Sequence, residues 1–400
     1  MRFASVKQFC RVLHRVLGLT VGLWAAAIAL SGSLLVFSHE IDAALNPHLL
    51  RVEAHSRAWN PDAAVAAVRQ QFPQTPLVSM RLPRRADESL LFRMGEEGSE
   101  EVYMDPYTSR VLGTRSEHDG LVGFLRNFHM HLLTGETGET ISGYLALLLI
   151  SIVATGLVLW WPKRGRVANA FKVRWRLPML PRMYDLHRVA GAVAGVFLLI
   201  PVVTGTMLVF HQVTTSFLIT SLGGPILSLP DKVPVPANAS REPVSRWLAS
   251  ASSALPGAEL VSVKFPQTEA EPAVVRLRFA ANTHPNGRSF VAIDPYTSRV
   301  LHAHDWRQIG TGLGISDYKY PLHIGTAFSL PGRLAVLLIG IVPLLLLATG
   351  WYIWWRKRQP AAGTVMQTTR LPAPTGLRGK PSVAGSRAPS IRHPASLSED

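Results

Sequence analysis

Cysteine is almost absent from this chain of 400 residues, in which Cys10 is the only one. A single cysteine excludes an intramolecular disulfide, an iron–sulfur cluster held by thiolates and covalent haem attachment through C-x-x-C-H. The sequence also lacks a P-loop, a G-x-G-x-x-G between a strand and a helix, an H-E-x-x-H zinc motif and a credible Ser/His/Asp arrangement. It therefore shows no obvious nucleotide or flavin site, and any haem would be held by coordination and packing alone.

Charged residues are also scarce, at 17% of the chain, and the hydrophobic residues, at 48%, occur in long runs. A helix that crosses a bilayer needs about 20 mainly apolar residues. Four runs are long enough, at residues 16–37, 141–161, 189–210 and 334–355. The first has a basic start, but no small-residue cleavage site follows it and the third run is its internal copy, so we expect a retained helix. The sequence predicts an integral membrane protein, mainly α-helical, with four transmembrane helices.

The basic residues indicate how these helices are oriented. The connection 162–186 carries seven Lys and Arg residues, and Arg356-Lys357-Arg358 follow the last run. Short basic segments stay in the cytoplasm. We therefore expect a multi-pass protein of the bacterial inner membrane, with both termini cytoplasmic and the large segments between helices periplasmic. The net charge of +15 is mostly this topology signal and does not indicate nucleic-acid binding.

This topology divides the chain into eight parts. They are a cytoplasmic N-terminus with the first helix (1–37), a periplasmic segment (38–140), the second helix (141–161), a basic cytoplasmic loop (162–186), the third helix (187–210), a second periplasmic segment (211–333), the fourth helix (334–355) and a cytoplasmic tail (356–400). The tail is rich in Pro, Ser, Ala, Gly and Arg without periodicity, so we expect it to be disordered.

The sequence is written twice. His-Arg-Val-Leu-Gly at 14–18 returns as His-Arg-Val-Ala-Gly at 187–191, and Asp-Pro-Tyr-Thr-Ser-Arg-Val-Leu at 105–112 returns unchanged at 294–301. Ala-Thr-Gly followed by Trp-Trp occurs near the end of the second and of the fourth run. Repeats of this length place related elements about a pseudo-two-fold axis. We therefore expect two pseudo-symmetric pairs of helices, in which a histidine from each copy can reach one site.

Each periplasmic segment predicts a small α+β module, at about 60–113 and 243–302. The predicted elements of the first are a helix at 62–72 after Asn60-Pro61 and strands at 77–82, 89–94 and 101–104; those of the second are a helix at 243–254 and strands at 260–265, 273–279 and 289–293. Both modules close with Asp-Pro-Tyr-Thr-Ser, in which proline suits a β-turn. Asp105 and Asp294 are expected to stabilise these turns and not to be catalytic.

A helix-plus-strands module that ends in D-P-Y-T-G/S resembles the PepSY domain. Four spans, of which the first and third open with His-Arg-x-x-Gly, alternate with such modules and resemble the PepSY-associated transmembrane family. The resemblance covers nearly all of residues 8–358, and it is closest to the dihaem siderophore reductases of the ferrioxamine-uptake type. It implies an oxidoreductase with two b-type haems that takes part in iron uptake. These motifs are specific for the family and less specific for its substrate.

The inner end of the membrane carries one histidine in each copy. Gly18 and Gly22 follow His14 at four-residue spacing, and glycines follow His187 at the same spacing. These glycines leave room beside the imidazole for a flat ring. Close packing of small residues between helices accounts for them without a cofactor. The repetition of the histidine with both glycines favours a haem b whose iron is held by His14 and His187.

The outer end offers more histidines than one haem needs. His131 and His323 stand in matching places before the second and fourth spans, and the family resemblance also points to them as ligands of a second haem iron. Less certain candidates, which the repeat does not support, are His129, His211 and His39. Arg126, Lys319 and Tyr318 are candidates for binding haem propionates or an anionic substrate, although interfacial anchoring explains them as well. Because His14 and His39 are about 37 Å apart along one helix, the two ends need separate sites.

Two axial imidazoles saturate the iron, which suits electron transfer across the bilayer. The expected activity is reduction of a ferric hydroxamate siderophore on the periplasmic side, which releases weakly held ferrous iron. The electron donor is external, either a quinol or a cytoplasmic reductant. A second hypothesis is a cofactor-free binding or regulatory protein whose outer modules capture peptides or a partner protein. A siderophore or iron permease is the least favoured, because neither half shows the interrupted helices typical of a midplane transport site.

Overall fold

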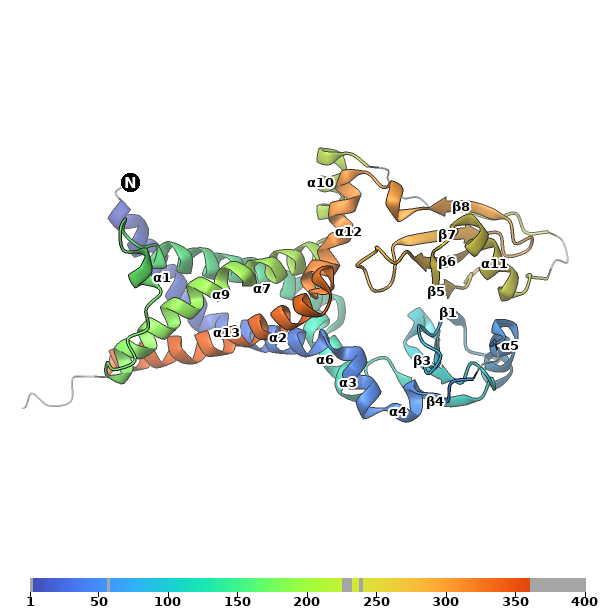
Figure 1. Cartoon of the computed structure of the whole chain (residues 1–400), viewed down its shortest axis with the longest axis horizontal. Helices are drawn as coiled ribbons and strands as arrows, with labels where there is room; N and C mark the ends of the chain where they lie inside the picture. Colours follow the sequence, from blue (N-terminus) through green and yellow to red (C-terminus); the bar gives the residue numbers. More distant parts are fainter. Residues whose placement is uncertain (1–2, 56–57, 225–231, 237–239, 360–400) are drawn as a thin grey trace, which may run out of the picture. The chain divides into compact units, whose positions relative to one another are not determined.

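The computed structural model describes residues 3–55, 58–224, 232–236 and 240–359. The predicted disorder of the tail falls almost entirely on 360–400, which lie outside the described residues. Long apolar helices from the N-terminal, central and C-terminal parts of the described chain pack side by side (Figure 1). They are α1 (Phe3–Thr20), α2 (Gly22–Leu35), α7 (Gly135–Trp160), α9 (Met179–Val209) and α13 (Ser329–Arg358).

Within the described residues, three helices are long and apolar enough to cross a membrane, and they are α7, α9 and the helix that contains α13. They include the predicted runs at 141–161, 189–210 and 334–355 almost completely and extend beyond them. The run predicted at 16–37 corresponds to α1 and α2 together, which form a fourth candidate span. The apolar runs alone therefore locate every candidate span of the described chain.

The first candidate span is not the continuous helix that the run 16–37 predicts. It is bent by 61° between α1 and α2, at Val21. The hydroxyl of Thr20 donates to the carbonyl of Val16, a side-chain bond that bends helices. Gly22 follows, and an added Cβ there would lie only 3.3 Å from Leu347 of α13. The bend lets α1 pack on α7 while α2 packs on α13.

Shorter helices connect the long ones. They are α3 (Ser38–Leu45), α4 (Pro47–Leu50), α6 (Gly120–His131), α8 (Val167–Ala170), α10 (His211–Leu222) and α12 (Thr311–His323). Helix α6 packs against α2 and α7, and α12 packs against α9 and α10. Helices α6 and α12 thus hold matching places in the two copies. Helix α6 precedes α7 and packs on α2, and α12 precedes α13 and packs on α9.

Eight strands form one antiparallel sheet in the order β4-β3-β2-β1-β5-β6-β7-β8. The strands are β1 (Leu77–Arg81), β2 (Leu90–Met94), β3 (Glu100–Met104), β4 (Val111–Ser116), β5 (Glu259–Lys264), β6 (Ala273–Arg278), β7 (Ser289–Ile293) and β8 (Val300–His304). The six strands that the sequence predicts are present. Strands β4 and β8 were not predicted, because they are partly exposed edge strands without a buried alternating face.

The two modules meet at the centre of this sheet, where β1 pairs antiparallel with β5. Ser79 lies opposite Lys264, and Arg81 lies opposite Ser262. Helices α5 (Pro61–Gln71) and α11 (Val244–Ala254) pack on the shared core, whose largest fully buried side chains are Trp247, Phe92, Phe265, Met80 and Leu90. The sequence predicted two modules, and the structure joins them through one sheet and one hydrophobic cluster.

Local capping follows the sequence signals closely. The side chain of Asn60 accepts from the backbone N–H groups of Asp62 and Ala63 at the start of α5. In the repeated turn, the carboxylate of Asp105 accepts from the backbone N–H of Tyr107 at 2.8 Å, and the second copy repeats this bond. The structural role predicted for Asp105 and Asp294 is therefore confirmed. The turns do not close the modules, however, because each leads into the edge strand β4 or β8.

Candidate functional site: two histidine pairs

The structure brings His14 and His187 together from α1 and α9. Their ring centroids are 6.2 Å apart and the ring planes are nearly perpendicular, at 81°. The two residues are repeat mates in the sequence, so the site lies where equivalent positions of the two copies meet. The inner pair is the one that the repeated His-Arg-x-x-Gly motif predicts.

Hydrogen bonds hold both imidazoles of this inner pair through Nδ1. Nδ1 of His14 lies 2.9 Å from the carbonyl oxygen of Ile152 and 3.3 Å from the hydroxyl of Thr155. Nδ1 of His187 lies 2.9 Å from the hydroxyl of Thr349, whose own proton goes to the carbonyl of Leu345. Carbonyls only accept, and the threonine hydroxyls already donate to carbonyls, so Nδ1 carries the proton in each ring. The unprotonated Nε2 is then free to bind a metal.

A glycine lies against each of these histidines. A Cβ added to Gly156 would lie 3.1 Å from Cε1 of His14, and one added to Gly350 would lie 3.3 Å from Cε1 of His187. Each glycine directly follows the threonine that contacts the same ring. The repeated Thr-Gly dipeptides on α7 and α13 therefore position the two rings. In each dipeptide the threonine hydroxyl accepts a hydrogen bond from the ring, and the glycine leaves space for the ring edge.

A second pair, His129 of α6 and His323 of α12, is built in the same way. Their ring centroids are 6.1 Å apart. Nδ1 of His129 lies 3.0 Å from the carbonyl of Ile28 and 3.2 Å from the hydroxyl of Ser31. Nδ1 of His323 lies 2.8 Å from the carbonyl of Pro201 and 3.3 Å from a threonine hydroxyl. Both rings therefore also present Nε2 as the free nitrogen.

The outer rings also rest on glycines. A Cβ on Gly32 would lie 2.5 Å from Cε1 of His129, and one on Gly205 would lie 2.9 Å from Cε1 of His323. These glycines directly follow Ser31 and Thr204, the hydroxyl residues that contact the same two rings. All four histidines thus share one environment, made of a backbone carbonyl, a Ser or Thr hydroxyl, and a glycine.

The separation of the rings fits two axial ligands on one iron. A metal–nitrogen bond is about 2 Å long and the nitrogen lies about 1 Å from the ring centre, so two trans imidazoles have centroids roughly 6 Å apart. Both pairs meet this value, at 6.2 and 6.1 Å. Within the described residues, no group of three or more His, Cys, Asp and Glu side chains is placed to hold a metal ion. Two imidazoles per site would be enough to hold a haem iron, because the porphyrin supplies the other four nitrogens.

Comparison with known proteins identifies the family of this chain. A family model described as the PepSY-associated TM region matches residues 11–357. The chain belongs to the PepSY-associated transmembrane family. No curated protein sequence matches the chain. Together with the apolar helices, membership of this family makes it a multi-pass membrane protein.

In this family member, the outer partner of His323 is His129, whereas the sequence pointed to His131. His131 faces Glu139, with 3.7 Å between Nδ1 and a carboxylate oxygen. The two less certain candidates lie elsewhere. His39, with 58% of its side chain exposed, lies 3.4 Å from Glu88. His211 contacts Lys319 and Thr215.

A signal for His129 exists in the sequence. Counted from the Thr-Gly dipeptides, His129 precedes Thr155 by 26 residues, and His323 precedes Thr349 by 26 residues. The alignment that paired His131 with His323 was based on the His-Leu-Leu-Thr-Gly segment. It differs by two residues from the alignment based on the Thr-Gly dipeptides. The same count works at the other sites, because 17 residues separate His14 from Ser31 and also His187 from Thr204.

The glycines singled out by the sequence have mixed surroundings. A Cβ on Gly18 would meet nothing within 4 Å, so space is open beside the inner pair. Gly22, Gly191 and Gly195 pack against side chains of neighbouring helices at 3.3 to 3.5 Å. These three therefore serve helix packing in this structure, and only Gly18 leaves free space next to a ligand.

Positive charge gathers around α12, on residues of that helix, of α6, and of strands β1 and β6 and nearby loops of the sheet. The residues that contribute it are Arg81, Arg84, Arg126, Arg276, Arg288 and Lys319. Lys319 is only 3% exposed, and its Nζ lies 2.5 Å from Nδ1 of His211 and 3.2 Å from the hydroxyl of Ser316. Burial lowers the pKa of Lys319 to about 8, and the charge of Arg288 adds to the shift. Two of the three residues expected near the outer histidines, Arg126 and Lys319, thus belong to one basic cluster, while Tyr318 is exposed.

Proposed function

We propose that this chain is a transmembrane dihaem b protein that carries electrons across the bacterial inner membrane and reduces a ferric siderophore at its periplasmic side. One observation carries the proposal. Four histidines, in two pairs, share the same carbonyl, hydroxyl and glycine environment, and each pair has the ring separation of two axial ligands. Helix packing alone requires none of these repeated contacts.

The residues that would hold the inner haem are His14 and His187, and those of the outer haem are His129 and His323. Bound haem supplies a one-electron couple at each end of the membrane helices. The carbonyls and hydroxyls at Nδ1 fix the ring orientations and make Nε2 a stronger donor. His187 and Thr204, which contacts His323, are 17 residues apart on α9, a rise of about 26 Å. One site would therefore lie near each face of the bilayer.

Ferric hydroxamate is a suitable acceptor because its iron is held tightly and ferrous iron is not. One electron converts each Fe(III) to Fe(II), and the hydroxamate oxygens that leave the metal take up protons from water. The electron comes from a donor outside the chain, a membrane quinol or a cytoplasmic reductant. This agrees with a sequence that has no nucleotide or flavin motif.

The basic cluster would serve the outer site by charge. Lys319 lies one helical turn before His323, and Arg288 forms an ion pair with Asp317 on the same helix. Guanidinium and ammonium groups there favour negatively charged groups, including haem carboxylates and the oxygen donors of a ferric chelate. Steering by this cluster depends on ionic strength, because charges at the surface are screened within about 10 Å at 0.1 M salt.

An absorption spectrum of the detergent-purified full chain tests the proposal. We expect a Soret band, sharp α and β bands after dithionite, and about two b-type haems per chain by the pyridine haemochrome assay. Ferric siderophore added to the reduced protein should reoxidise it. A colourless protein from haem-replete cells would end the reductase proposal and favour the cofactor-free binding protein. If a ferric siderophore leaves the reduced bands unchanged, the chain would still be a haem electron carrier, but the siderophore would not be its substrate.

A further inference from the structure

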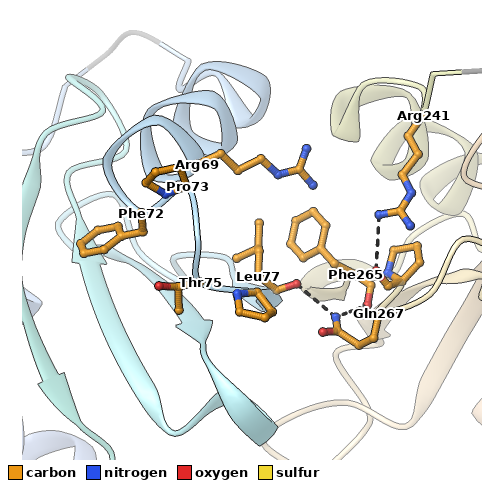
Figure 2. A pocket seen from close by; sticks show the side chains of 10 residues that line it. Arg69, Phe72, Pro73, Thr75, Leu77, Arg241, Phe265 and Gln267 are labelled. Atoms are coloured by element: carbon orange, nitrogen blue, oxygen red, sulfur yellow. Dashed lines mark hydrogen bonds between the residues drawn. The ribbon is translucent and has the colours of Figure 1, made fainter.

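A pocket of about 360 Å³ lies where the two modules meet, on the side of α5 and α11. Its lining comes from both modules. The residues are Arg69, Phe72, Pro73, Thr75, Pro76 and Leu77 from the first and Arg241, Phe265, Pro266 and Gln267 from the second. Figure 2 shows Arg69 and Arg241 reaching toward the pocket from opposite sides, with Phe265 and Leu77 between them. Its volume lies in the range of small-molecule sites.

The two arginines bring two positive charges to this pocket. Arg241 donates to the backbone carbonyls of Pro266 at 3.4 Å and Thr268 at 3.0 Å. The guanidinium of Arg69 lies over the ring of Phe265, 5.9 Å from its centroid. Within the described residues, neither arginine forms an ion pair with a carboxylate. Partial burial lowers the pKa of Arg69, and the charge of Arg241 lowers it further, so an anion between them would be stabilising.

The rest of the lining includes apolar side chains. Phe72, Pro73 and Pro76 keep part of their surface accessible, whereas Leu77 and Phe265 are buried. The amide of Gln267 donates to the backbone carbonyls of Leu77 and Phe265. The combination of two cations with an apolar wall suits a ligand with one anionic group and an apolar body.

The position in the sheet excludes one common mode of peptide capture. A peptide that adds a strand needs a free sheet edge. Strands β1 and β5 border the pocket, and each already has two neighbours within the eight-stranded sheet. The free edges are β4 and β8, at the far ends of the strand order. A small molecule therefore suits this pocket better than an extended chain.

We propose that this pocket binds a small organic acid, whose carboxylate lies between Arg69 and Arg241 and whose apolar part packs against Phe72 and Pro76. The site joins residues of both modules, so its occupant would hold the β1–β5 junction together. It uses none of the four paired histidines, and the proposal stands whether or not the chain binds haem.

Isothermal titration of the detergent-purified full chain with hexanoate tests this site. We expect saturable binding of hexanoate, and at least about tenfold weaker binding of hexanamide and of acetate. Arg69→Gln and Arg241→Gln should each weaken hexanoate binding about tenfold, because each removes a charge-assisted hydrogen bond. Arg246→Gln is the matched control, because Arg246 is exposed on α11 and pairs with Glu242, away from the pocket lining.

Three results would overturn the proposal. They are the absence of saturable hexanoate binding, equal affinity for hexanoate and hexanamide, and unchanged affinity in both arginine variants. Hexyl phosphate and inorganic phosphate form a second arm of the titration. If either phosphate binds more tightly than hexanoate, the natural ligand would carry a phosphate group and not a carboxylate. Much tighter binding of a short apolar peptide with a free carboxyl end would replace the small acid with a peptide terminus.

Discussion

At the scale of single residues, the four paired histidines are distinguished by what surrounds them. The chain has 14 histidines, and burial or position alone does not select four of them. The selection comes from a shared environment, in which a carbonyl and a hydroxyl hold Nδ1 and a glycine admits the ring edge. Of the outer candidates, His129 has this environment, and His131, His211 and His39 have other partners.

Replacing His129 with alanine should remove one haem and leave the other. The ring of His129 lies 6.1 Å from that of His323, whereas His131 faces Glu139. We therefore expect His129→Ala to contain about one haem per chain and His131→Ala to keep about two. His14→Ala should also lose one haem but keep the outer one. Pyridine haemochrome quantitation measures all three, and a loss at His131 with none at His129 would reverse the assignment of the outer ligand.

Gly32→Ala should disturb the outer site without touching a ligand. The new Cβ would lie 2.5 Å from Cε1 of His129, closer than carbon atoms approach in proteins. We expect the variant to lose most of the outer haem or to shift its α band. Gly314→Ala is the control, because its Cβ would lie 3.9 Å from Ile309 and alanine favours a helix. Full haem content with unchanged bands in Gly32→Ala would show that the ring does not need this space.

At the scale of elements, ion pairs connect the membrane helices to the sheet. Arg115 of β4 lies 2.6 Å from a carboxylate oxygen of Asp42 on α3 and 3.1 Å from one of Glu101 on β3. Arg288 forms an ion pair with Asp317 of α12. The contacts differ in the two copies, although both tie a sheet segment to a helix that follows or precedes a long helix. The two copies therefore agree in the order of their helices and strands, but these ion pairs between helix and sheet differ.

Arg115→Met should destabilise the first module strongly. The side chains of Asp42 and Glu101 are 9% and 4% exposed. The variant leaves the carboxylate of Asp42 buried without its cation, whereas Glu101 keeps its ion pair with Arg93. Removing one partner of a buried ion pair costs about 3 kcal/mol. Thermal unfolding in detergent should show this loss. Arg110→Met, an exposed arginine in the turn before β4, is the matched control and should change the melting temperature little. Equal melting of the two variants would contradict a stabilising role for the network.

The bend between α1 and α2 shows how one element serves both sites. His14 lies on α1 beside α7, and Ser31 lies on α2 beside His129. The 61° bend between these helices lets α1 pack on α7 while α2 packs on α13. One bent span thus carries His14 of the inner pair at one end and Ser31, which contacts His129 of the outer pair, at the other.

At the scale of the whole molecule, two copies of one plan build both the helices and the sheet. The candidate spans come from both copies, and so do the histidines of each pair and the strands β1 and β5 at the centre of the sheet. Such an arrangement needs both modules on the same side of the membrane. The predicted topology meets this need, because it places 38–140 and 211–333 together in the periplasm.

Labelling of single cysteines tests this topology. A membrane-impermeant maleimide applied to intact spheroplasts should label Glu96→Cys in the first module and should not label Arg164→Cys in the basic connection, both of which are exposed positions. Permeabilised cells should label both. The native Cys10 is buried and is changed to Ser in both backgrounds. Labelling of Arg164→Cys in intact spheroplasts would invert the predicted orientation.

The sequence by itself determined the positions of the candidate spans and, in the two modules, the helices, the repeated turn and six of the eight strands. Apolar runs located every candidate span in the described chain, Asn60-Pro61 marked a helix start, and the repeated turn placed Asp105 and Asp294. These features depend on local hydrophobicity, capping and turn chemistry, which short stretches of sequence carry. Repetition further indicated that His14 and His187 meet.

Only the tertiary structure decided how α1 and α2 bend and that two modules share one sheet. It also decided between the two sequence alignments that pair His323 with His129 or with His131. The choice between His129 and His131 depends on which ring reaches Ser31 and Gly32, about 100 residues earlier in the chain. The β1–β5 pairing likewise joins segments far apart in the sequence. The hydrophobic pattern of a strand does not specify which other edge strand it pairs with. Contacts between distant segments depend on the packing of the whole chain, and no local stretch of sequence encodes them.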